Sequence, residues 1–354
     1  MDTRVGQTVR EKIEEREQSV LSPYACRSAE SQGRMRVEEE CPLRPAFQRD
    51  RDRILYSQAF RLLKHKTQVF LAPSRDHCRT RLTHTLEVSE IARTMARALD
   101  LNEDLVEAVS LGHDLGHTPF GHAGETVLNE LVPGGFSHYR QSLRVVDVLE
   151  NNGLGLNLTY EVRDGIAKHS KGYGEVLPVD RHGLPETAEG CVVRYGDIIA
   201  YLGHDLDDAI HCGIINDSDV PDICNKVMGR SHSSRIMTMI EGVITHTTPV
   251  SDGLEGERLK FGVDPAVGEA MQILREFLFH RVYRAPQVHS EFLKARKMLK
   301  DLFVYAISHP EFLEEETAGN GADTPMVRRA CDCIASMSDR HAQNLYHRLF
   351  VLER

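Results

Sequence analysis

The sequence predicts an all-α protein, and three observations lead to this prediction. Apolar residues recur at helical spacing in one segment after another, and no stretch alternates apolar and polar residues between hairpin turns. Stretches that contain Gly and Pro separate the helical segments. The chain of 354 residues is 41% hydrophobic and 27% charged and has no low-complexity tract, which is typical of a globular protein with one large domain or two fused ones.

Composition also excludes several classes of protein. Lys and Arg number 43 against 53 Asp and Glu, so the net charge of −10 argues against a broad basic face for nucleic acid or anionic membranes and leaves room only for a local basic pocket. No apolar run approaches the roughly 18 residues of a membrane span, and the N-terminus carries charges where a signal peptide has an apolar core. We therefore expect a cytoplasmic protein without a membrane partner. Its eight scattered cysteines are expected to be reduced and to pack, not to bind metal.

The first part of the chain divides into an arm and a series of helices. Residues 1–46 are charged and irregular, which predicts an N-terminal arm with one short helix near 11–20. Helical spacing begins after this arm, with a single buried stripe formed by Leu55, Ala59, Leu62 and Leu63. Further stripes over 88–99 and 105–109 lead into LGHDLGHTPFGHAGE, whose four glycines and one proline require a turn.

The second part of the chain continues the helical pattern. Beyond the turn, helices are predicted around 127–131, 143–149, 162–166, 189–211, 236–244, 271–282, 292–307 and 327–349. Loops with Gly or Pro separate them at 170–187, 246–265 and 317–325. The apolar pattern is diluted near 215–235, so we expect a core region over 47–215 and a C-terminal helical region over 216–354 packed on it.

Histidine stands out, with 18 in the chain and a cluster between His84 and His138. His84 and His113 each fall on the apolar stripe of their helix, so both are expected to point inward. A single inward histidine is usually a hydrogen-bonded core residue. His113, however, is followed directly by Asp114, and a buried carboxylate beside a buried imidazole is unfavourable unless a cation or hydrogen-bond donors compensate. A divalent metal ion would provide that compensation.

A second set of polar residues shares one face of the predicted helix over 189–211: Asp197, Tyr201, His204, Asp205 and Asp208. Exposure to solvent is the usual fate of such a face, but this one has three Asp and no Lys or Arg, so cation or substrate binding accounts for it better. Together with His84, His113 and Asp114, Asp197 completes a set of two His and two Asp. Such mixed ligands suit Mn²⁺, Mg²⁺, Co²⁺, Ni²⁺, Fe²⁺ or Zn²⁺ and leave positions for water and substrate.

The order H…HD…D, formed by His84, His113, Asp114 and Asp197, resembles that of the HD-domain metal-dependent phosphohydrolases. Six blocks in order narrow the resemblance to the bacterial deoxyguanosine triphosphate triphosphohydrolase-like proteins, a dNTPase family: FQRDRDRILYSQAFRLLKHKTQVF, RTRLTHTLEVSEIAR, GHDLGHTPFGHAGE, GGFSHYRQSLRVVD, NLTYEVRDGIAKHS and GDIIAYLGHDLDDA. They cover at least 47–210. The resemblance implies an HD-domain helical bundle with additional C-terminal helices.

The activity implied by this resemblance is the metal-dependent hydrolysis of a dNTP to deoxynucleoside and tripolyphosphate, by attack on the α-phosphorus. The family's metal ligands fall on His84, His113, Asp114 and Asp197. Its catalytic histidine and acid fall on His122 and Glu125, which lie on one helix face, where a carboxylate can orient an imidazole that moves a proton. His117 matches a further catalytic position.

The resemblance also implies substrate contacts, which fall on Gln68, Arg81, His138, Lys168, Tyr201 and Asp205. Triphosphate needs positive charge, for which Arg81, Lys168 and the Arg75/Arg79 pair are candidates. Tyr201 is expected to pack under the deoxyribose and exclude a 2′-hydroxyl, and Asp205 to bind the 3′-hydroxyl. This chain departs from the family block at Tyr139, which follows His138 and bears on the base or ribose pocket.

Partners follow from the same resemblance, which implies a homo-oligomer and a dNTP or single-stranded DNA effector. Two other functions stay open. One is an HD phosphohydrolase of another nucleotide, such as a monophosphate or a signalling nucleotide, and the other is a non-catalytic module that senses nucleotide or DNA. The complete ligand set with His122 and Glu125 argues against the last of these.

Overall fold

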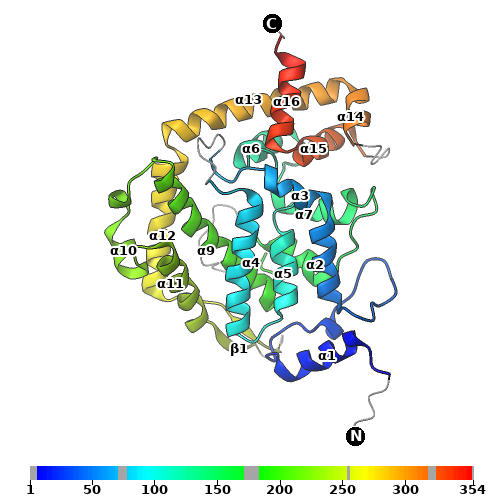
Figure 1. Ribbon diagram of the computed structural model, residues 1–354, viewed down its shortest axis with the longest axis vertical. Coiled ribbons are helices and arrows are strands. Elements are labelled where there is room, and N and C mark those ends of the chain that lie inside the picture. The colour runs from blue at the N-terminus through cyan, green and yellow to red at the C-terminus, as the bar shows by residue number, and fades with distance from the viewer. Residues whose placement is uncertain (1–5, 71–77, 171–182, 253–255, 318–323, 353–354) are drawn as a thin grey trace.

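The computed structural model describes residues 6–70, 78–170, 183–252, 256–317 and 324–352. In these ranges the chain forms sixteen α-helices and one two-stranded hairpin (Figure 1), so the predicted all-α fold is confirmed. None of the helices described there combines the length and the apolar character that a membrane span requires.

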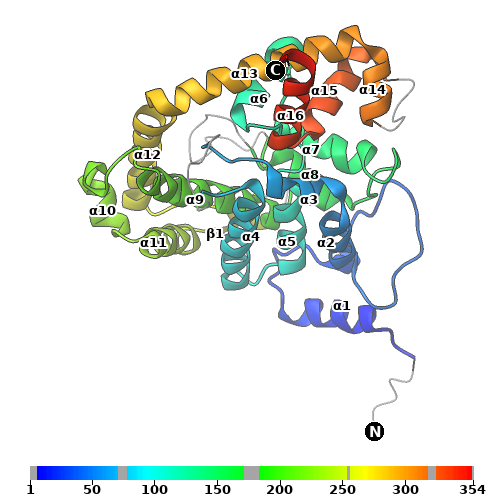
Figure 2. The ribbon, with the colours of Figure 1, turned by 45° about the horizontal axis from the view of Figure 1, so that its top comes forward.

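Five helices form the centre of the molecule: α2 (Ala46–Tyr56), α4 (Arg81–Ala98), α5 (Glu103–Gly112), α8 (Tyr160–Lys168) and α9 (Ala188–His211). α4 packs against α5 and α9, and α5 also packs against α2 and α8. The helices α2, α5 and α4 run side by side in both Figure 1 and Figure 2. Because α4 and α9 are direct neighbours, polar residues on their facing sides can meet.

The position of α4 and its contact with α9 follow from local sequence. The Thr80 hydroxyl accepts a hydrogen bond from the N–H of Thr83, and the Thr83 hydroxyl accepts one from the N–H of Thr80, so two donors at the start of α4 are satisfied. α9 approaches α4 closely at Gly196, where an added Cβ would lie 3.0 Å from the Cβ of Ala92. This close approach places the next residue, Asp197, beside α4.

The remaining elements surround this centre. In chain order they are α1 (Val9–Val20), a 3₁₀ turn (Ser28–Glu30), α3 (Gln58–Leu62), a 3₁₀ turn (Leu63–His65), α6 (His122–Leu131), α7 (His138–Arg144), a π-helical turn (Val145–Leu149), a 3₁₀ turn (Asp217–Asp219), α10 (Asp222–Met228), α11 (His232–Thr245), β1 (Thr248–Asp252), β2 (Gly256–Lys260), α12 (Pro265–Leu278), a π-helical turn (Phe279–Tyr283), α13 (Pro286–Ser308), α14 (Pro310–Thr317), α15 (Met326–Ser336) and α16 (Asp339–Phe350). α1 lies on the opposite side of the molecule from α13 to α16 (Figure 2). The N-terminal arm contacts the centre through Glu161 of α8, which accepts hydrogen bonds from the Ser31 hydroxyl and the N–H of Gln32.

Two expected helices are interrupted, so those expectations were wrong. The stripe over 55–63 is divided at Ser57, whose hydroxyl accepts a hydrogen bond from the N–H of Phe60 and so starts α3. The segment 327–349 likewise forms two helices, α15 and α16, and the Ser338 hydroxyl caps the second. In both places the apolar spacing indicated one helix, and a serine cap starts a second helix instead.

The expected loop over 246–265 contains the hairpin, which the sequence did not indicate. Its strands Thr248–Asp252 and Gly256–Lys260 are antiparallel, with Val250 opposite Arg258. Strands of five residues are too short for alternation to stand out in a sequence. The hairpin leaves the fold class unchanged.

Buried apolar side chains form two clusters. The first runs from Ala25 to Val282 and includes the inner faces of α4, α5 and α9. The second, between Phe120 and Leu345, is built by α6 together with α13 to α16. α13 packs against α6, α15 and α16 and lies across one end of the molecule (Figure 1). The two cores therefore overlap in sequence, because α6 joins the second one, while the domain boundaries near 46 and 215 stay predictions.

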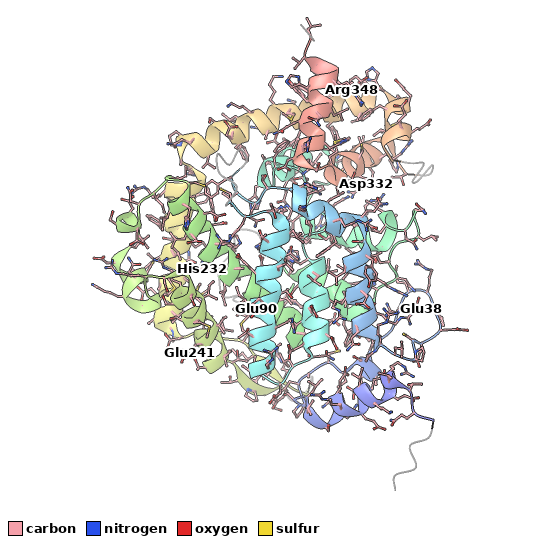
Figure 3. All side chains as sticks on the ribbon, viewed as in Figure 1. Glu38, Glu90, His232, Glu241, Asp332 and Arg348 are labelled. Atoms are coloured by element: carbon pink, nitrogen blue, oxygen red, sulfur yellow. The ribbon has the colours of Figure 1, made fainter. Side chains whose placement is uncertain are left out.

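One carboxylate fixes α15 to α7. Asp332 accepts hydrogen bonds from Nε2 of Gln141 at 2.9 Å and from Nη2 of Arg144 at 2.7 Å, and it pairs with Arg328 at 3.0 Å. Figure 3 shows Asp332 where the C-terminal helices face the rest of the chain. Because α7 begins at His138, this contact ties the C-terminal helices to an element that carries a predicted site residue.

Candidate active site

The four side chains predicted to bind a metal ion come together between the central helices. α4 carries His84, the residues after α5 are His113 and Asp114, and α9 carries Asp197. Nε2 of His84 lies 3.3 Å from Nε2 of His113 and 3.3 Å from Oδ1 of Asp197, while Nε2 of His113 lies 3.5 Å from Oδ1 of Asp114. Atoms bound to one ion at about 2.1 Å stand about 3 to 4 Å apart. The spacing of His84, His113 and Asp114 therefore fits a single metal ion, and Asp197 adjoins these three through Nε2 of His84.

The hydrogen bonds of the two imidazoles favour a cation between them. Nδ1 of His113 donates to the backbone oxygen of Ser110 at 2.6 Å, and Nδ1 of His84 faces Nε2 of His204 at 2.8 Å. When each Nδ1 carries the proton, both Nε2 lone pairs point at each other across 3.3 Å, an arrangement that is repulsive without a cation. The cluster could therefore hold a divalent metal ion.

Electrostatics around the two carboxylates agree with this arrangement. Burial opposes the charged form of Asp114, but the surrounding histidines and Arg81 outweigh it and hold the pKa of Asp114 well below its usual range. Burial likewise opposes the charged form of Asp197, but His84 outweighs it and lowers the pKa of that carboxyl. Both carboxyl groups are thus anionic at neutral pH.

A second group of titratable side chains adjoins the first through Asp114. Nε2 of His117 lies 3.6 Å from Oδ1 of Asp114, and the His117 ring stacks on His138 with the ring centroids 4.1 Å apart. Oε1 of Glu125 lies 2.9 Å from both the backbone nitrogen and Nδ1 of His138. Burial alone would lower the pKa of His138, but Glu125 outweighs burial and raises it. Among the described residues, Nδ1 of His117 has no hydrogen-bond partner.

His169 is a further member of this group that the sequence reasoning missed. Its Nδ1 donates to the backbone oxygen of Ile166 at 2.8 Å, and its Nε2 lies 3.2 Å from Nε2 of His138. Burial lowers the pKa of His169 to about 3, so its ring is neutral and its Nε2 can accept a hydrogen bond from His138. Its spacing from Val162 and Ile166, both buried, placed it on the inward stripe of α8 and was the signal that could have found it.

His122 lies at the rim of the group. Its side chain is 61% exposed, and its Nδ1 is 3.4 Å from Oε2 of Glu125. The preceding turn requires Gly121, which has φ +53° and whose added Cβ would lie 2.8 Å from the backbone oxygen of Gln68 and 2.9 Å from Nη2 of Arg81. Glu125 thus contacts both an exposed and a buried imidazole, and it lies closer to His138 than to the predicted partner His122.

Two buried cations stand beside the carboxylates. Nη1 of Arg81 lies 2.6 Å from Oδ2 of Asp114, so the guanidinium predicted to bind phosphate is paired with a predicted metal ligand. Lys66, which the sequence reasoning did not single out, donates from Nζ to the backbone oxygens of His117 at 2.5 Å and of Ala335 at 2.9 Å. Burial lowers the pKa of Lys66 to about 7. No local pattern marks this lysine, because its partners are distant in the sequence.

Most of the polar face of α9 is buried: His204, Asp205 and Asp208 are buried, whereas Asp197 and Tyr201 are partly exposed. Its neutralising cation comes from elsewhere: Arg79 contacts Asp208 at 2.5 Å and Asp207 at 3.0 Å. The Asp205 carboxylate accepts a hydrogen bond from the Tyr283 hydroxyl at 2.6 Å. Tyr201 packs at the edge of the first apolar cluster. Asp205 and Tyr201 are therefore brought to the same side of α9 as Asp197.

The other predicted substrate contacts are spread more widely. Lys168 ends α8 and pairs with Asp164 and, at 3.2 Å, with Glu186. The Oε1 atom of Gln68 is buried without a hydrogen-bond partner in the described part of the chain. The ring of Tyr139 meets that of His138 edge-on at 5.8 Å between centroids. Arg75 lies outside the described residues.

A cavity of about 940 Å³ lies beside Leu115 and Gly116. Lys66 and Gly116 form part of its wall, and Arg36, Arg61 and Arg329 also line it. The metal-ligand cluster does not border this cavity. The His and Asp cluster, whose donor geometry could hold a metal ion, is therefore the candidate site, and this cavity is not.

Comparison with known proteins agrees with the site. Residues 81–202 match the HD domain, and residues 261–348 match the phosphohydrolase-associated domain. Three relatives share the description deoxyguanosinetriphosphate triphosphohydrolase-like protein. The relative from Desulfatibacillum aliphaticivorans is 56% identical over 97% of this chain and 98% of its own length. The relative from Caldanaerobacter subterraneus subsp. tengcongensis is 48% identical over 97% of this chain and 96% of its own length. The relative from Clostridium perfringens (strain 13 / Type A) is 42% identical over 97% of this chain and 98% of its own length. The chain therefore belongs to the HD-domain family of deoxyguanosinetriphosphate triphosphohydrolase-like proteins.

Proposed function

We propose that this protein is a metal-dependent dNTP triphosphohydrolase that converts a deoxynucleoside triphosphate and water into deoxynucleoside and tripolyphosphate. The observation that carries the proposal is the cluster of His84, His113 and Asp114, with Asp197 against His84, in a chain whose relatives are described as deoxyguanosinetriphosphate triphosphohydrolase-like. These four side chains would hold the ion. A divalent ion bound there supplies Lewis acidity, which polarises a phosphoryl oxygen and lowers the pKa of bound water.

The surrounding side chains supply proton handling and positive charge. Attack of water on the α-phosphorus breaks the bond from that phosphorus to O5′, so the attacking water loses a proton and O5′ gains one. His122 is exposed and touches Glu125, which supports its assignment as the group that gives or takes that proton. Arg81 carries positive charge beside Asp114, and Glu125 favours the protonated form of His138, which supports roles for both beside the triphosphate. His117 is held between the two groups and is proposed as a further catalytic residue.

We assign sugar and base recognition to α9 and the segment before α4. Tyr201 lies one turn after Asp197, and its ring would leave no room for a ribose 2′-hydroxyl. The predicted contacts of Asp205 with the 3′-hydroxyl, of Gln68 with sugar and base, and of Lys168 with phosphate stay predictions. The homo-oligomer, the dNTP or single-stranded DNA effector and the identity of the ion are likewise predictions without a residue assignment.

Two variants of the ligand set test the division of roles. Asp114→Ala and His84→Ala should lose Mn²⁺ binding and turnover together, because each removes a ligand. His122→Ala should keep Mn²⁺ binding and lose turnover, because this residue lies at the rim and is not a ligand. Mn²⁺ binding is measured by equilibrium dialysis and turnover by separation of nucleoside from nucleotide. Equal loss of Mn²⁺ in all three variants would show that the assignment is wrong.

A further inference from the structure

A chain of buried polar contacts runs from His84 away from the metal-ligand cluster. Nδ1 of His84 lies 2.8 Å from Nε2 of His204, and the two rings meet edge-on with centroids 5.0 Å apart. Both side chains are buried, and His204 is fully buried on α9. His84 therefore presents one ring nitrogen to the ligand cluster and the other to a second histidine.

The chain continues beyond His204 into the C-terminal part of the protein. Nδ1 of His204 lies 2.8 Å from Oδ1 of Asp205, a close contact that is not aligned as a linear hydrogen bond. Oδ2 of Asp205 accepts a hydrogen bond from the Tyr283 hydroxyl at 2.6 Å. Tyr283 closes the π-helical turn after α12, inside the segment that matches the phosphohydrolase-associated domain. Three links thus connect that segment to His84.

We propose that His204 is a positioning residue for His84, and that Asp205 and Tyr283 hold His204 in the orientation and tautomer this task needs. The inference rests on the proposed function, because it assigns Nε2 of His84 to a metal ion. It adds residues to that site which act on the ion only through His84.

The positions of the protons on the two rings explain why His84 needs His204. A histidine that binds metal through Nε2 must carry its proton on Nδ1, and that N–H needs an acceptor. Nε2 of His204 can accept it only when His204 carries its own proton on Nδ1. Oδ1 of Asp205 stands beside that Nδ1 and favours the proton there, while the Tyr283 hydroxyl donates to the other carboxylate oxygen. His113 meets the same need in a simpler way, through the backbone oxygen of Ser110.

A purely structural role for His204 makes a different prediction. If His204 only fills space between α4 and α9, any side chain of similar size should support metal binding equally well. Leucine and glutamine are close to each other in size, and only glutamine offers an oxygen that can accept the proton of His84. The matched pair His204→Leu and His204→Gln therefore separates hydrogen bonding from packing.

The test measures Mn²⁺ affinity of the full chain without nucleotide, from the EPR signal of free Mn²⁺ during titration. His204→Leu should weaken binding roughly 10- to 100-fold, the range for loss of a partner of a metal ligand. His204→Gln should restore affinity to within about threefold of wild type, and Tyr283→Phe should cause a smaller loss than His204→Leu. His211→Ala is the control, because His211 lies on the same helix with its side chain 64% exposed.

The outcomes separate this inference from the function on which it rests. Wild-type affinity in His204→Leu, or equal weakening by Leu and Gln, would overturn the positioning role while the metal site stands. If His204→Leu does not fold, as judged by circular dichroism, Tyr283→Phe decides, and unchanged affinity in that variant overturns the proposed chain of contacts. A wild-type protein that binds no Mn²⁺ would instead contradict the proposed function itself.

Discussion

Replacing Lys66 with methionine should change how the stability of the protein depends on pH. Its ammonium group is fully buried and donates hydrogen bonds to the backbone oxygens of His117 and Ala335. These contacts join the loop of the candidate site to the end of α15. Methionine is of similar length and apolar, so it removes the charge and both hydrogen bonds without opening a large cavity.

The size of this change in the free energy of unfolding follows from the pKa of Lys66, which burial lowers from 10.5 to about 7. Between these two values the unfolded chain binds more protons than the folded one, so the free energy of unfolding rises as the pH increases from about 7 towards 10.5. Below pH 7 the penalty for burying the charge is fully present. At about 1.4 kcal/mol for each pH unit, the whole effect is about 5 kcal/mol, of which about 2 kcal/mol falls between pH 7 and pH 9.

Urea unfolding at these two pH values measures the effect. The free energy of unfolding of wild type should rise by about 2 kcal/mol relative to Lys66→Met between pH 7 and pH 9. Every other titrating group cancels in this difference, and the two carbonyls that lose a donor add a constant of about 1–3 kcal/mol each. Lys64→Met, at an exposed position in the same turn, is the control and should follow wild type. A difference between wild type and Lys66→Met that is the same at both pH values would refute the reasoning.

Three further variants test the surroundings of the site. Glu125→Gln removes the carboxylate that raises the pKa of His138, so turnover should fall roughly 10²- to 10⁴-fold with unchanged Mn²⁺ affinity, and a loss of Mn²⁺ would mean that Glu125 is itself a ligand. Asp339→Ala leaves the buried N–H of Phe120 without its acceptor and should lower the free energy of unfolding by about 3 kcal/mol in urea titration, whereas a change below about 0.5 kcal/mol would speak against this. Tyr201→Ala should reduce the preference for dGTP over GTP in parallel rate measurements, and an unchanged preference would remove the support for its role.

Much of the helical framework could be predicted because a buried helix has apolar residues at helical spacing within a short stretch of sequence. The spacing of apolar residues located α4, α9 and α13, and it placed His84 and His113 on inward faces, as the structure bears out. It could also be inferred that the acidic face of α9 binds a cation or a substrate, because three aspartates without a cation are unstable in plain solvent; in the structure Arg79 pairs with Asp208. These features depend on residues within a few turns of one another.

What the sequence did not reveal depends on contacts between distant segments. Arg79, which neutralises the acidic face of α9, precedes α4, and Tyr283, which anchors Asp205, follows α12. Lys66 bridges His117 and the last turn of α15. Periodicity carries no information about such pairs, because each partner occupies an ordinary position in its own helix or loop. The divisions at Ser57 and Ser338 were missed for another reason, since a cap overrides an apolar stripe that continues through it.

Identification of the phosphate product tests the central claim most directly. Purified protein is incubated with dGTP and Mn²⁺, and the product is identified by phosphorus NMR, with Asp114→Ala as the control. The account predicts tripolyphosphate and deoxyguanosine from wild type and neither from the variant. Orthophosphate or pyrophosphate as the first product would move the attack to another phosphorus, and absence of turnover with any of the four dNTPs in Mn²⁺, Mg²⁺ or Co²⁺ would contradict the proposed function.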